Sequence, residues 1–590
     1  MIRRLLPYSL LAPGLAWLGL FFVVPMFFMG IVAMESGSLS TGFEFSWDLS
    51  NFTDSVSNYR DVFLRSFAYG GIATILALLI AYPLAYAIAF RGGRGKTVLL
   101  AAVVAPFFTT YLIRTLAWQT ILADESPVVD FLHTISLVPR EGRVLDTSAS
   151  VIAGLTYNFL PFMILPIYAV LERLDRRLIE AARDLYSSAR SAFLHVTLPL
   201  SAPGVVAGIL LTFIPAVGDY VNAYFLGGPN QAMIGNVIQG QYLELSNYPV
   251  AAALSFVFMA LVITVVLIYL RLAGTKALIG DEESATVQPS GPMSTPAGGR
   301  GVLGWLRARA LNIYAGGAIA YMLIPIAVIA VFSFNDPAGN FNITWQGFTL
   351  DYWAHPLAQQ DLTDAMITSI ELAALSTVIA TAIGTMLALA LVRHRFRGRR
   401  AGNVLVLIPI ATPEVVIGAA LLSMFVYVGI ARGFTTLLIA HVMFSISFVV
   451  VVVRSRLIGF DRSLEEAAAD LGAGPLATFR TITLPLLGPA ILAAALLAFM
   501  LSIDDFVISN FNSGDTLTFP LYIFGASQRG IPVEVYSIAT MLFAVTALAM
   551  AFTVWQQRRA EKMAAMRPDD LEDPALTPAP IPPAPGALGG

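Results

Sequence analysis

Blocks of about 20 apolar residues recur along most of this chain, and each block has the length that a helix needs to cross a hydrocarbon core ~30 Å thick. Of the 590 residues, 57% are hydrophobic and only 12% are charged, which lies far outside the range of soluble proteins. The blocks lack the two-residue alternation of a membrane β-barrel. The sequence therefore predicts an all-α polytopic membrane protein with about 12 transmembrane helices. The expected spans are residues 10–33, 67–90, 98–122, 149–171, 202–225, 250–271, 311–333, 366–391, 402–427, 434–454, 487–509 and 536–556.

A polar segment occurs twice, 286 residues apart. Residues 174–199 read LDRRLIEAARDLYSSARSAFLHVTLP, and residues 460–485 read FDRSLEEAAADLGAGPLATFRTITLP. Because a repeated unit marks repeated structure, we expect two like halves of about six helices each. Their connection and the C-terminal tail are rich in Gly, Pro, Ser and Thr, which is typical of flexible segments. The expected domains are a first half at 1–273, a linker at 274–304, a second half at 305–560 and a disordered tail at 561–590.

Lys and Arg gather in the loops on one side of the predicted spans, which identifies that side as cytoplasmic. Both copies of the repeated segment and both chain termini fall on this side. The N-terminal apolar run is expected to be a retained first span. On the opposite side, residues 335–364 contain four Asp and no Lys or Arg. This acidity favours a cationic solute or a basic patch on a partner, although it is also the ordinary complement of the positive-inside rule.

Each copy of the repeated segment predicts a short amphipathic helix, because Leu and Ala recur at three- and four-residue steps. Gly472 is expected to end the second helix in the left-handed conformation, whereas the first copy has Tyr186 at this position. A single helix of this kind would suit a position on the membrane interface. Two copies at matching places favour a docking site for a partner outside the membrane.

The pattern Glu-Ala-Ala, three residues, Gly, with Leu-Pro downstream, resembles the coupling loop of bacterial ABC importer permeases, which docks into the ATP-hydrolysing subunit. The first copy departs from the family at Tyr186, so its docking geometry is expected to differ. The resemblance implies a coupling role for a set of residues in the two loops. These are Glu180, Ala181, Ala182, Asp184, Glu466, Ala467, Ala468, Asp470 and Gly472.

The resemblance extends over nearly all of both halves. Residues 59–89 resemble one permease of the spermidine/putrescine importer family, and residues 501–511 resemble its partner permease. This implies the architecture of a type I ABC importer permease, in the bacterial inner membrane, with two usually separate subunits fused. It also implies two copies of an ATP-binding subunit that holds ATP and Mg, a solute-binding protein, surrounding lipid and a small cationic substrate, with no nucleic acid and no cofactor in this chain. Similar permeases carry opines, phosphonates, thiamine or ferric ions, so these substrates stay open.

Carboxylates lie inside the predicted fifth span of each half, where each costs roughly 2.5 to 3.5 kcal/mol. Asp219 and Asp505 are equivalent under the 286-residue offset. They are suited to replacing water around the ammonium groups of a passing polyamine, or to ending a broken helix near the outer interface. The neighbouring aromatic residues are suited to cation–π contact or to simple packing. The expected pathway residues are Asp219, Tyr220, Asp504, Asp505 and Phe506.

Other classes of function find little support in the sequence. There is no Cys, and the five His are scattered without metal-ligand spacing, so no metal site is expected. Gly95-Lys96-Thr97 resembles the end of a phosphate-binding loop, but position 90 is Phe instead of Gly, so the chain itself is not expected to hydrolyse ATP. A secondary transporter of two parallel repeats is the main alternative, and it leaves the two cytoplasmic loops unexplained. A membrane enzyme would need a nucleophile, base or metal constellation that does not stand out.

Overall fold

The computed structural model describes residues 2–565 except positions 187, 274–301, 340–341, 343, 395 and 462. The predicted linker therefore lies almost wholly outside the described residues, as do most of the predicted tail and the Tyr186 side chain. The chain divides into two compact units, residues 1–543 and 544–590. The described residues are overwhelmingly helical, which confirms the all-α prediction.

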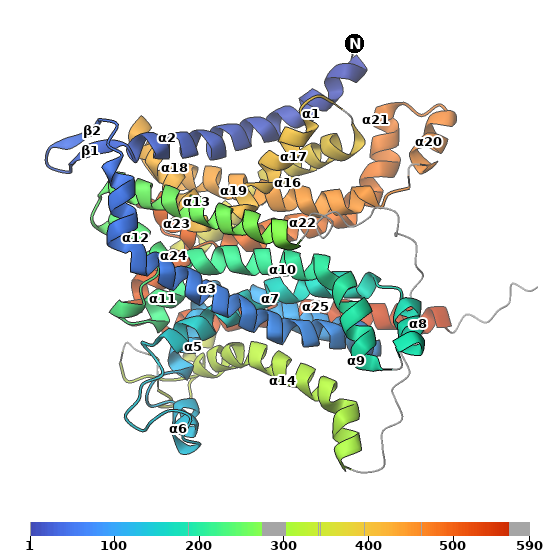
Figure 1. The fold of residues 1–590 in the computed structure, drawn as a ribbon, viewed down its shortest axis with the longest axis horizontal. Helices are drawn as coiled ribbons and strands as arrows, with labels where there is room; N and C mark the ends of the chain where they lie inside the picture. Colours follow the sequence, from blue (N-terminus) through green and yellow to red (C-terminus); the bar gives the residue numbers. More distant parts are fainter. Residues whose placement is uncertain are drawn as a thin grey trace, which may run out of the picture. The chain divides into compact units, whose positions relative to one another are not determined.

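Long helices form the transmembrane part of each half (Figure 1). In the first half they are α1 (Ile2–Leu18), which continues through a π turn at Gly19–Val23 into α2 (Val24–Val32), then α3 (Ser50–Arg91), α4 (Lys96–Val104) with α5 (Tyr111–Ile121), α7 (Ser148–Arg173), α10 (Leu198–Gly218) and α13 (Tyr248–Ala273). In the second half they are α14 (Val302–Phe332), α16 (Gln360–Arg393), α17 (Arg399–Leu407) with α18 (Glu414–Val428), α19 (Phe434–Ile458), α22 (Leu484–Asp504) and α25 (Val533–Ala565).

Short elements connect these helices. They are the antiparallel hairpin of β1 (Glu35–Ser38) and β2 (Gly42–Phe45), together with α6 (Pro127–Thr134), α8 (Arg176–Tyr186), α9 (Ala189–Ala192), α11 (Val221–Leu226), α12 (Ile234–Gln239), α15 (Asp351–Ala354), α20 (Ser463–Asp470), α21 (Pro475–Thr478), α23 (Val507–Asn512) and α24 (Phe519–Ser527). Within residues 1–543, α8 and α20 lie toward one end of the long helices, and the hairpin lies toward the other (Figure 1).

Among the described residues, nine helices are long and apolar enough to cross a membrane. Two further spans are bent helix pairs: the axes turn by 94° between α4 and α5 and by 106° between α17 and α18. These are the third predicted spans of the two halves, 98–122 and 402–427, and each was expected to be one continuous helix. Pro106 and Pro409 lie in 3-10 turns just before the breaks. Proline favours a break there, because it removes a backbone donor and disfavours a continuing helix. The twelfth predicted span, 536–556, falls within α25.

The predicted fifth spans, 202–225 and 487–509, are also interrupted. The helix α10 ends at Gly218 and α22 ends at Asp504, and each is followed by a separate short helix. The residues Asp219 and Asp505 stand at these ends with extended backbone angles. A single 20-residue apolar run thus hides a break that hydropathy does not reveal.

The first span of each half packs against the other half. The first span of the chain contacts α16 and α18, whereas α14 contacts α3 and α5. Tyr157 of α7 donates a hydrogen bond to the Met322 carbonyl of α14 over 2.9 Å, and the rings of Trp118 and Tyr321 lie 5.7 Å apart. The two halves are consequently interlocked, and separating them would expose the apolar faces of both exchanged helices.

Small residues allow the closest helix contacts. At Gly70 of α3, a Cβ would lie 2.4 Å from Val217 Cγ2 and 3.0 Å from Val217 N in α10. The adjacent Gly71 has no atom within 4 Å of its Cβ position. The two glycines therefore share one helix and differ in whether a side chain can fit.

We predict that Gly70→Val destabilises the purified chain by about 1 to 3 kcal/mol, because an overpacked contact must force α3 and α10 apart. Gly71→Val is the matched control, since it makes the same chemical change in the same helix. The test is thermal unfolding of both variants in detergent. Equal unfolding temperatures for the two variants would contradict the close packing of α3 on α10.

Candidate functional site

The carboxylates of Asp219 and Asp505 hold together the two breaks in the fifth spans. Asp219 Oδ1 accepts a hydrogen bond from the Asn222 backbone N–H at 2.8 Å. Asp505 Oδ2 accepts one from the Ser509 backbone N–H, also at 2.8 Å, and one from Ser509 Oγ at 2.7 Å. Each Asp thus satisfies backbone donors at the start of the short helix that follows. The sequence allowed two roles for these carboxylates, ending a broken helix and binding the solute. The geometry shows the first role and leaves the second open.

The break in the third span brings Tyr111 to the same place. Tyr111 is the first residue of α5, and its backbone N–H donates to Asp504 Oδ1 of the other half at 2.7 Å. Its hydroxyl donates to Asp219 and accepts a hydrogen bond from Asn222 Nδ2 at 2.6 Å. One break is therefore capped by a carboxylate from the opposite half, which ties the two halves together at the site.

Glu414 occupies the matching position in the second half. It is the first residue of α18, just after the break at Pro413, and it interacts electrostatically with Asp505, Asp504 and Asp219. We call these four residues, Asp219, Glu414, Asp504 and Asp505, the carboxylate cluster. The cluster collects acidic groups from three separate segments of the chain.

Arg114 supplies a positive charge beside the cluster. It is only 3% exposed, and its Nη2 lies 3.9 Å from Asp504 Oδ2. Its Nε and Nη1 have no hydrogen-bond partner among the described residues. Four carboxyl groups lie beside this single guanidinium, so acidic groups outnumber basic ones and the site is suited to a cation.

Tyr220 and Phe506 meet between the halves. They are equivalent under the 286-residue offset, their ring centroids lie 5.7 Å apart, and they are 1% and 2% exposed. The Tyr220 hydroxyl accepts a hydrogen bond from Asn510 Nδ2 at 3.0 Å. We call these two residues the aromatic pair. Phe506 also packs on Phe524, with ring centroids 4.8 Å apart, so ring packing is the role that the geometry shows.

His441 supports Asp505 from behind. Its Nε2 lies 2.9 Å from Ser509 Oγ and 3.4 Å from Asp505 Oδ2, and its Nδ1 lies 2.7 Å from Ser502 Oγ. The equivalent position in the first half holds Leu155. Asp219 instead accepts a hydrogen bond from Asn222 Nδ2 at 3.2 Å, and Asn222 Oδ1 accepts one from Asn158 Nδ2 at 3.1 Å. The two carboxylates thus stand in pseudo-symmetric places with different supports.

Sequence reasoning missed Tyr111, Arg114, Glu414 and His441 as members of this site. Arg114 and Glu414 carried the signal that identified the aspartates, a charged residue inside a predicted span. His441 carried a related signal, since it is an ionisable residue inside the predicted span 434–454. Tyr111 carried none, because its role depends on a helix break and on contacts between distant segments.

The repeated segments form the short helices α8 and α20, as predicted. Asp175 and Asp461 begin these helices in the same way, each accepting a hydrogen bond at 2.9 Å from the backbone N–H two residues later. Gly472 follows α20 with φ of 86°, which confirms the left-handed ending. The duplicated Asp is therefore a helix-capping residue.

The predicted coupling residues divide between two faces. Ala182 and Ala468 are buried against their own chain, at 3% and 8% exposure. The others are exposed, namely Glu180, Ala181, Asp184, Glu466, Ala467, Asp470 and Gly472. Apolar residues accompany them on the open surface, with Leu185 at 81% and Leu471 at 90% exposure. Each helix thus presents a mixed acidic and apolar face to solvent.

The two helices are anchored differently. Glu465 Oε1 accepts hydrogen bonds from Arg393 Nη2 at 3.1 Å and Thr483 Oγ1 at 2.7 Å, which joins α20 to the ends of α16 and α22. The equivalent residue in the first copy is Ile179, which is 2% exposed. One helix is therefore held by a partly buried ion pair and the other by apolar packing.

Comparison with known proteins accounts for the duplication. Residues 15–275 and 380–562 match the family described as the binding-protein-dependent transport system inner membrane component. The spermidine/putrescine transport system permease protein PotB of Haemophilus influenzae is 36% identical over 257 residues, which are 43% of this chain and 90% of the relative. PotC of the same organism is 38% identical over 247 residues, 42% of this chain and 94% of the relative.

The permease protein PotC of Escherichia coli is 40% identical over 228 residues, which are 38% of this chain and 86% of the relative. Relatives of the two kinds cover the two halves. Because the matched ranges span most of the 590 residues, the chain belongs to the family of binding-protein-dependent transport system inner membrane components, with the family's domain present twice.

Proposed function

We propose that this chain forms the complete transmembrane pathway of an ATP-driven importer for polyamines such as spermidine and putrescine. The relatives of both halves are named as spermidine/putrescine transport system permease proteins. The two halves, 1–273 and 305–560, then act as two fused permeases. Both termini and the repeated segments face the cytoplasm, in accord with the Lys and Arg distribution.

The observation that carries the polyamine assignment is the carboxylate cluster. Removing a polyamine ammonium group from water is costly unless an opposite charge replaces its hydration. Asp219, Glu414, Asp504 and Asp505 offer that charge at the breaks of the spans, with only partial neutralisation by Arg114. The capping hydrogen bonds use some of the carboxylate oxygens and hold the groups in place for the solute.

The helices α8 and α20 are the proposed docking sites for two copies of an ATP-binding subunit. Their exposed faces combine Glu180 and Glu466 with Leu185 and Leu471, a mixture of charged and apolar groups suited to a protein partner. A solute-binding protein would deliver the polyamine on the opposite side.

Coupling of ATP hydrolysis to transport then follows from the connections between the docking helices and the fifth spans. The helix α20 is tied to α16 and α22 through Glu465, and α22 leads directly to Asp505 and Phe506. When the ATP-binding subunits close, movement of α8 and α20 would travel along α10 and α22 and part the aromatic pair. The site would then open alternately to the two sides of the membrane.

The proposed function is tested by uptake of labelled spermidine into proteoliposomes that hold the chain with its ATP-binding subunit and solute-binding protein. We expect uptake only when ATP and the binding protein are both present. Uptake driven by an ion gradient without ATP would indicate a secondary transporter instead. Uptake of thiamine but not of spermidine would retain the importer and overturn the polyamine assignment.

A substitution can remove the negative charges of Asp219 and Asp505 while keeping their helix-capping hydrogen bonds. Asn caps helices about as well as Asp, so Asp219→Asn with Asp505→Asn keeps the capping side chains and removes two charges. We predict that spermidine uptake falls by at least about tenfold, which corresponds to ~1.4 kcal/mol. The measurement is the initial uptake rate at a fixed amount of folded protein.

Asp515→Asn is the matched control, because Asp515 is exposed and lies outside the cluster. Its uptake should equal that of the unmodified chain. Normal uptake by the double Asp219 and Asp505 variant would reduce these carboxylates to helix-capping residues.

The docking helices yield a separate prediction. Glu180→Arg together with Glu466→Arg reverses the charge on both exposed faces, and we expect spermidine uptake to be lost while the variant remains folded. The measurement is ATP hydrolysis and uptake in the same proteoliposomes, with Arg397→Ala as a control at an exposed charge outside both helices. Undiminished uptake with the usual ratio of hydrolysis to transport would refute docking at these faces.

A further inference from the structure

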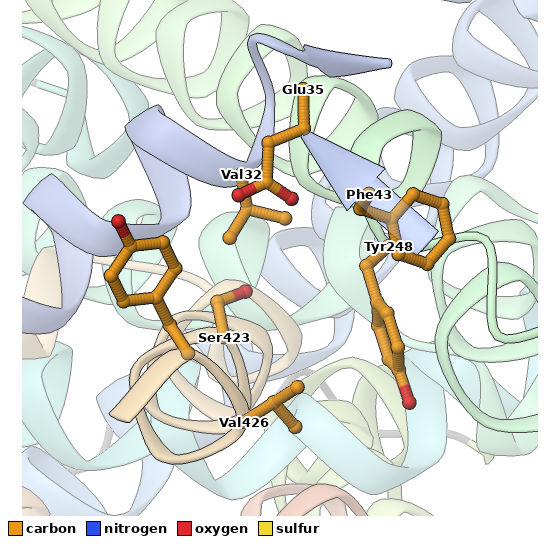
Figure 2. A pocket seen from close by; sticks show the side chains of 7 residues that line it. Val32, Glu35, Phe43, Tyr248, Ser423 and Val426 are labelled. Carbon is orange, nitrogen blue, oxygen red and sulfur yellow. The ribbon is translucent and has the colours of Figure 1, made fainter. Parts of the chain in front are cut away.

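A second candidate site lies at the hairpin, away from the carboxylate cluster. It is a cavity of about 260 Å³ between the first span, the hairpin, the start of α13 and the end of α18 (Figure 2). Both halves contribute to its wall. The lining residues are Val32, Glu35, Phe43, Tyr248, Ser423, Val426 and Tyr427.

Glu35 is the charged group of this cavity. It is 8% exposed, and among the described residues no hydrogen-bond donor or cation contacts its carboxylate. Its side chain points toward the middle of the ring of lining side chains (Figure 2). Burial raises the pKa of the Glu35 carboxyl above its ordinary value, because loss of water penalises the charged form. A cation in the cavity would relieve that penalty.

The position of Glu35 is fixed by the backbone. The Asn51 side chain donates to the Glu35 carbonyl at 2.9 Å and to the Ala33 carbonyl at 3.1 Å. The hairpin pairs Glu35 with Phe45 and Gly37 with Phe43 in antiparallel register. The carboxylate is therefore held over the cavity by structure that does not involve its own oxygens.

Aromatic rings form two sides of the cavity. The rings of Phe43 and Tyr248 meet at 5.8 Å with planes 70° apart, and the ring of Tyr427 packs on Phe28 at 4.9 Å. Ser423 completes the wall from the second half, held by a hydrogen bond with the Tyr242 hydroxyl at 2.8 Å. A carboxylate together with aromatic faces is the combination that recognises alkylammonium groups.

We propose that this cavity binds the ammonium end of an alkylamine, with Glu35 as the counter-charge and the Phe43, Tyr248 and Tyr427 rings around the cation. Its volume suits an ammonium group with a short alkyl chain. The amine has two possible sources, a free polyamine or the headgroup of an aminophospholipid. Only the first source rests on the proposed function. Because both halves line the cavity, an occupant would stabilise the packing of the first span on the second half.

The test measures the chemical reactivity of the Glu35 carboxyl group directly. The full chain is placed in phosphatidylcholine nanodiscs and treated with a diazoacetamide tag, which esterifies carboxyl groups without an added amine, and modification is mapped by peptide mass spectrometry. We expect saturating putrescine to slow modification of Glu35 by about tenfold or more, and the neutral analogue 1,4-butanediol to leave it unchanged. Glu44, exposed on the same hairpin, is the internal control and should react equally in every sample.

A second arm replaces part of the lipid with phosphatidylethanolamine and is measured both without and with putrescine. Protection in this arm, with no further protection by putrescine, would assign the cavity to the lipid headgroup. Protection by putrescine in phosphatidylcholine alone would assign it to a free amine. In either case, Phe43→Leu with Tyr248→Leu should raise the protecting concentration several-fold.

Equal modification of Glu35 under all conditions would overturn the proposal. That outcome is separate from failure of the proposed function, which is measured by spermidine uptake with the complete assembly. Loss of uptake without loss of Glu35 protection would leave the cavity intact as an amine site, and normal uptake without protection would remove only the cavity.

Discussion

Every break in a membrane-spanning helix exposes backbone N–H groups that lipid cannot satisfy, and this constraint determines where the polar groups of the site lie. The α5 break is capped by Asp504, and the breaks after α10 and α22 are capped by Asp219 and Asp505. The same carboxylates that satisfy the backbone thereby gather in one place. The proposed cation site therefore lies where the fold already requires acceptors.

The two halves have similar helix arrangements but differ at individual charged residues. Asp504 has Gly218 as its counterpart, and Glu465 has Ile179. These replacements place extra charge in the second half, both in the carboxylate cluster and at α20. Exchange of the first spans interlocks the halves, so that the differences act within one body. A fused chain also guarantees that each half meets its intended partner, whatever the role of residues 274–304.

The sequence predicted what depends on local pattern. Apolar block length predicted the helical class, the repeat predicted two halves, and Gly472 predicted the ending of α20. The breaks at Tyr111 and Glu414 were missed because hydropathy runs across them without interruption. The packing of each first span on the opposite half could not be predicted, since the apolar surface of a helix does not specify which neighbouring helix it contacts. The Glu35 cavity depends on a hairpin meeting α13 and α18, segments far apart in the chain.

The proposed mechanism requires that closure of nucleotide-bound partner subunits on α8 and α20 parts the aromatic pair. The chain has no Cys, so Phe506→Cys gives a unique thiol at a position that is 2% exposed. In proteoliposomes of the complete assembly, a membrane-impermeant thiol reagent is added on the side that receives the solute. The account predicts slow labelling without nucleotide and labelling at least about tenfold faster when ATP is trapped in the partner subunits. Equal labelling rates with and without trapped ATP would contradict it.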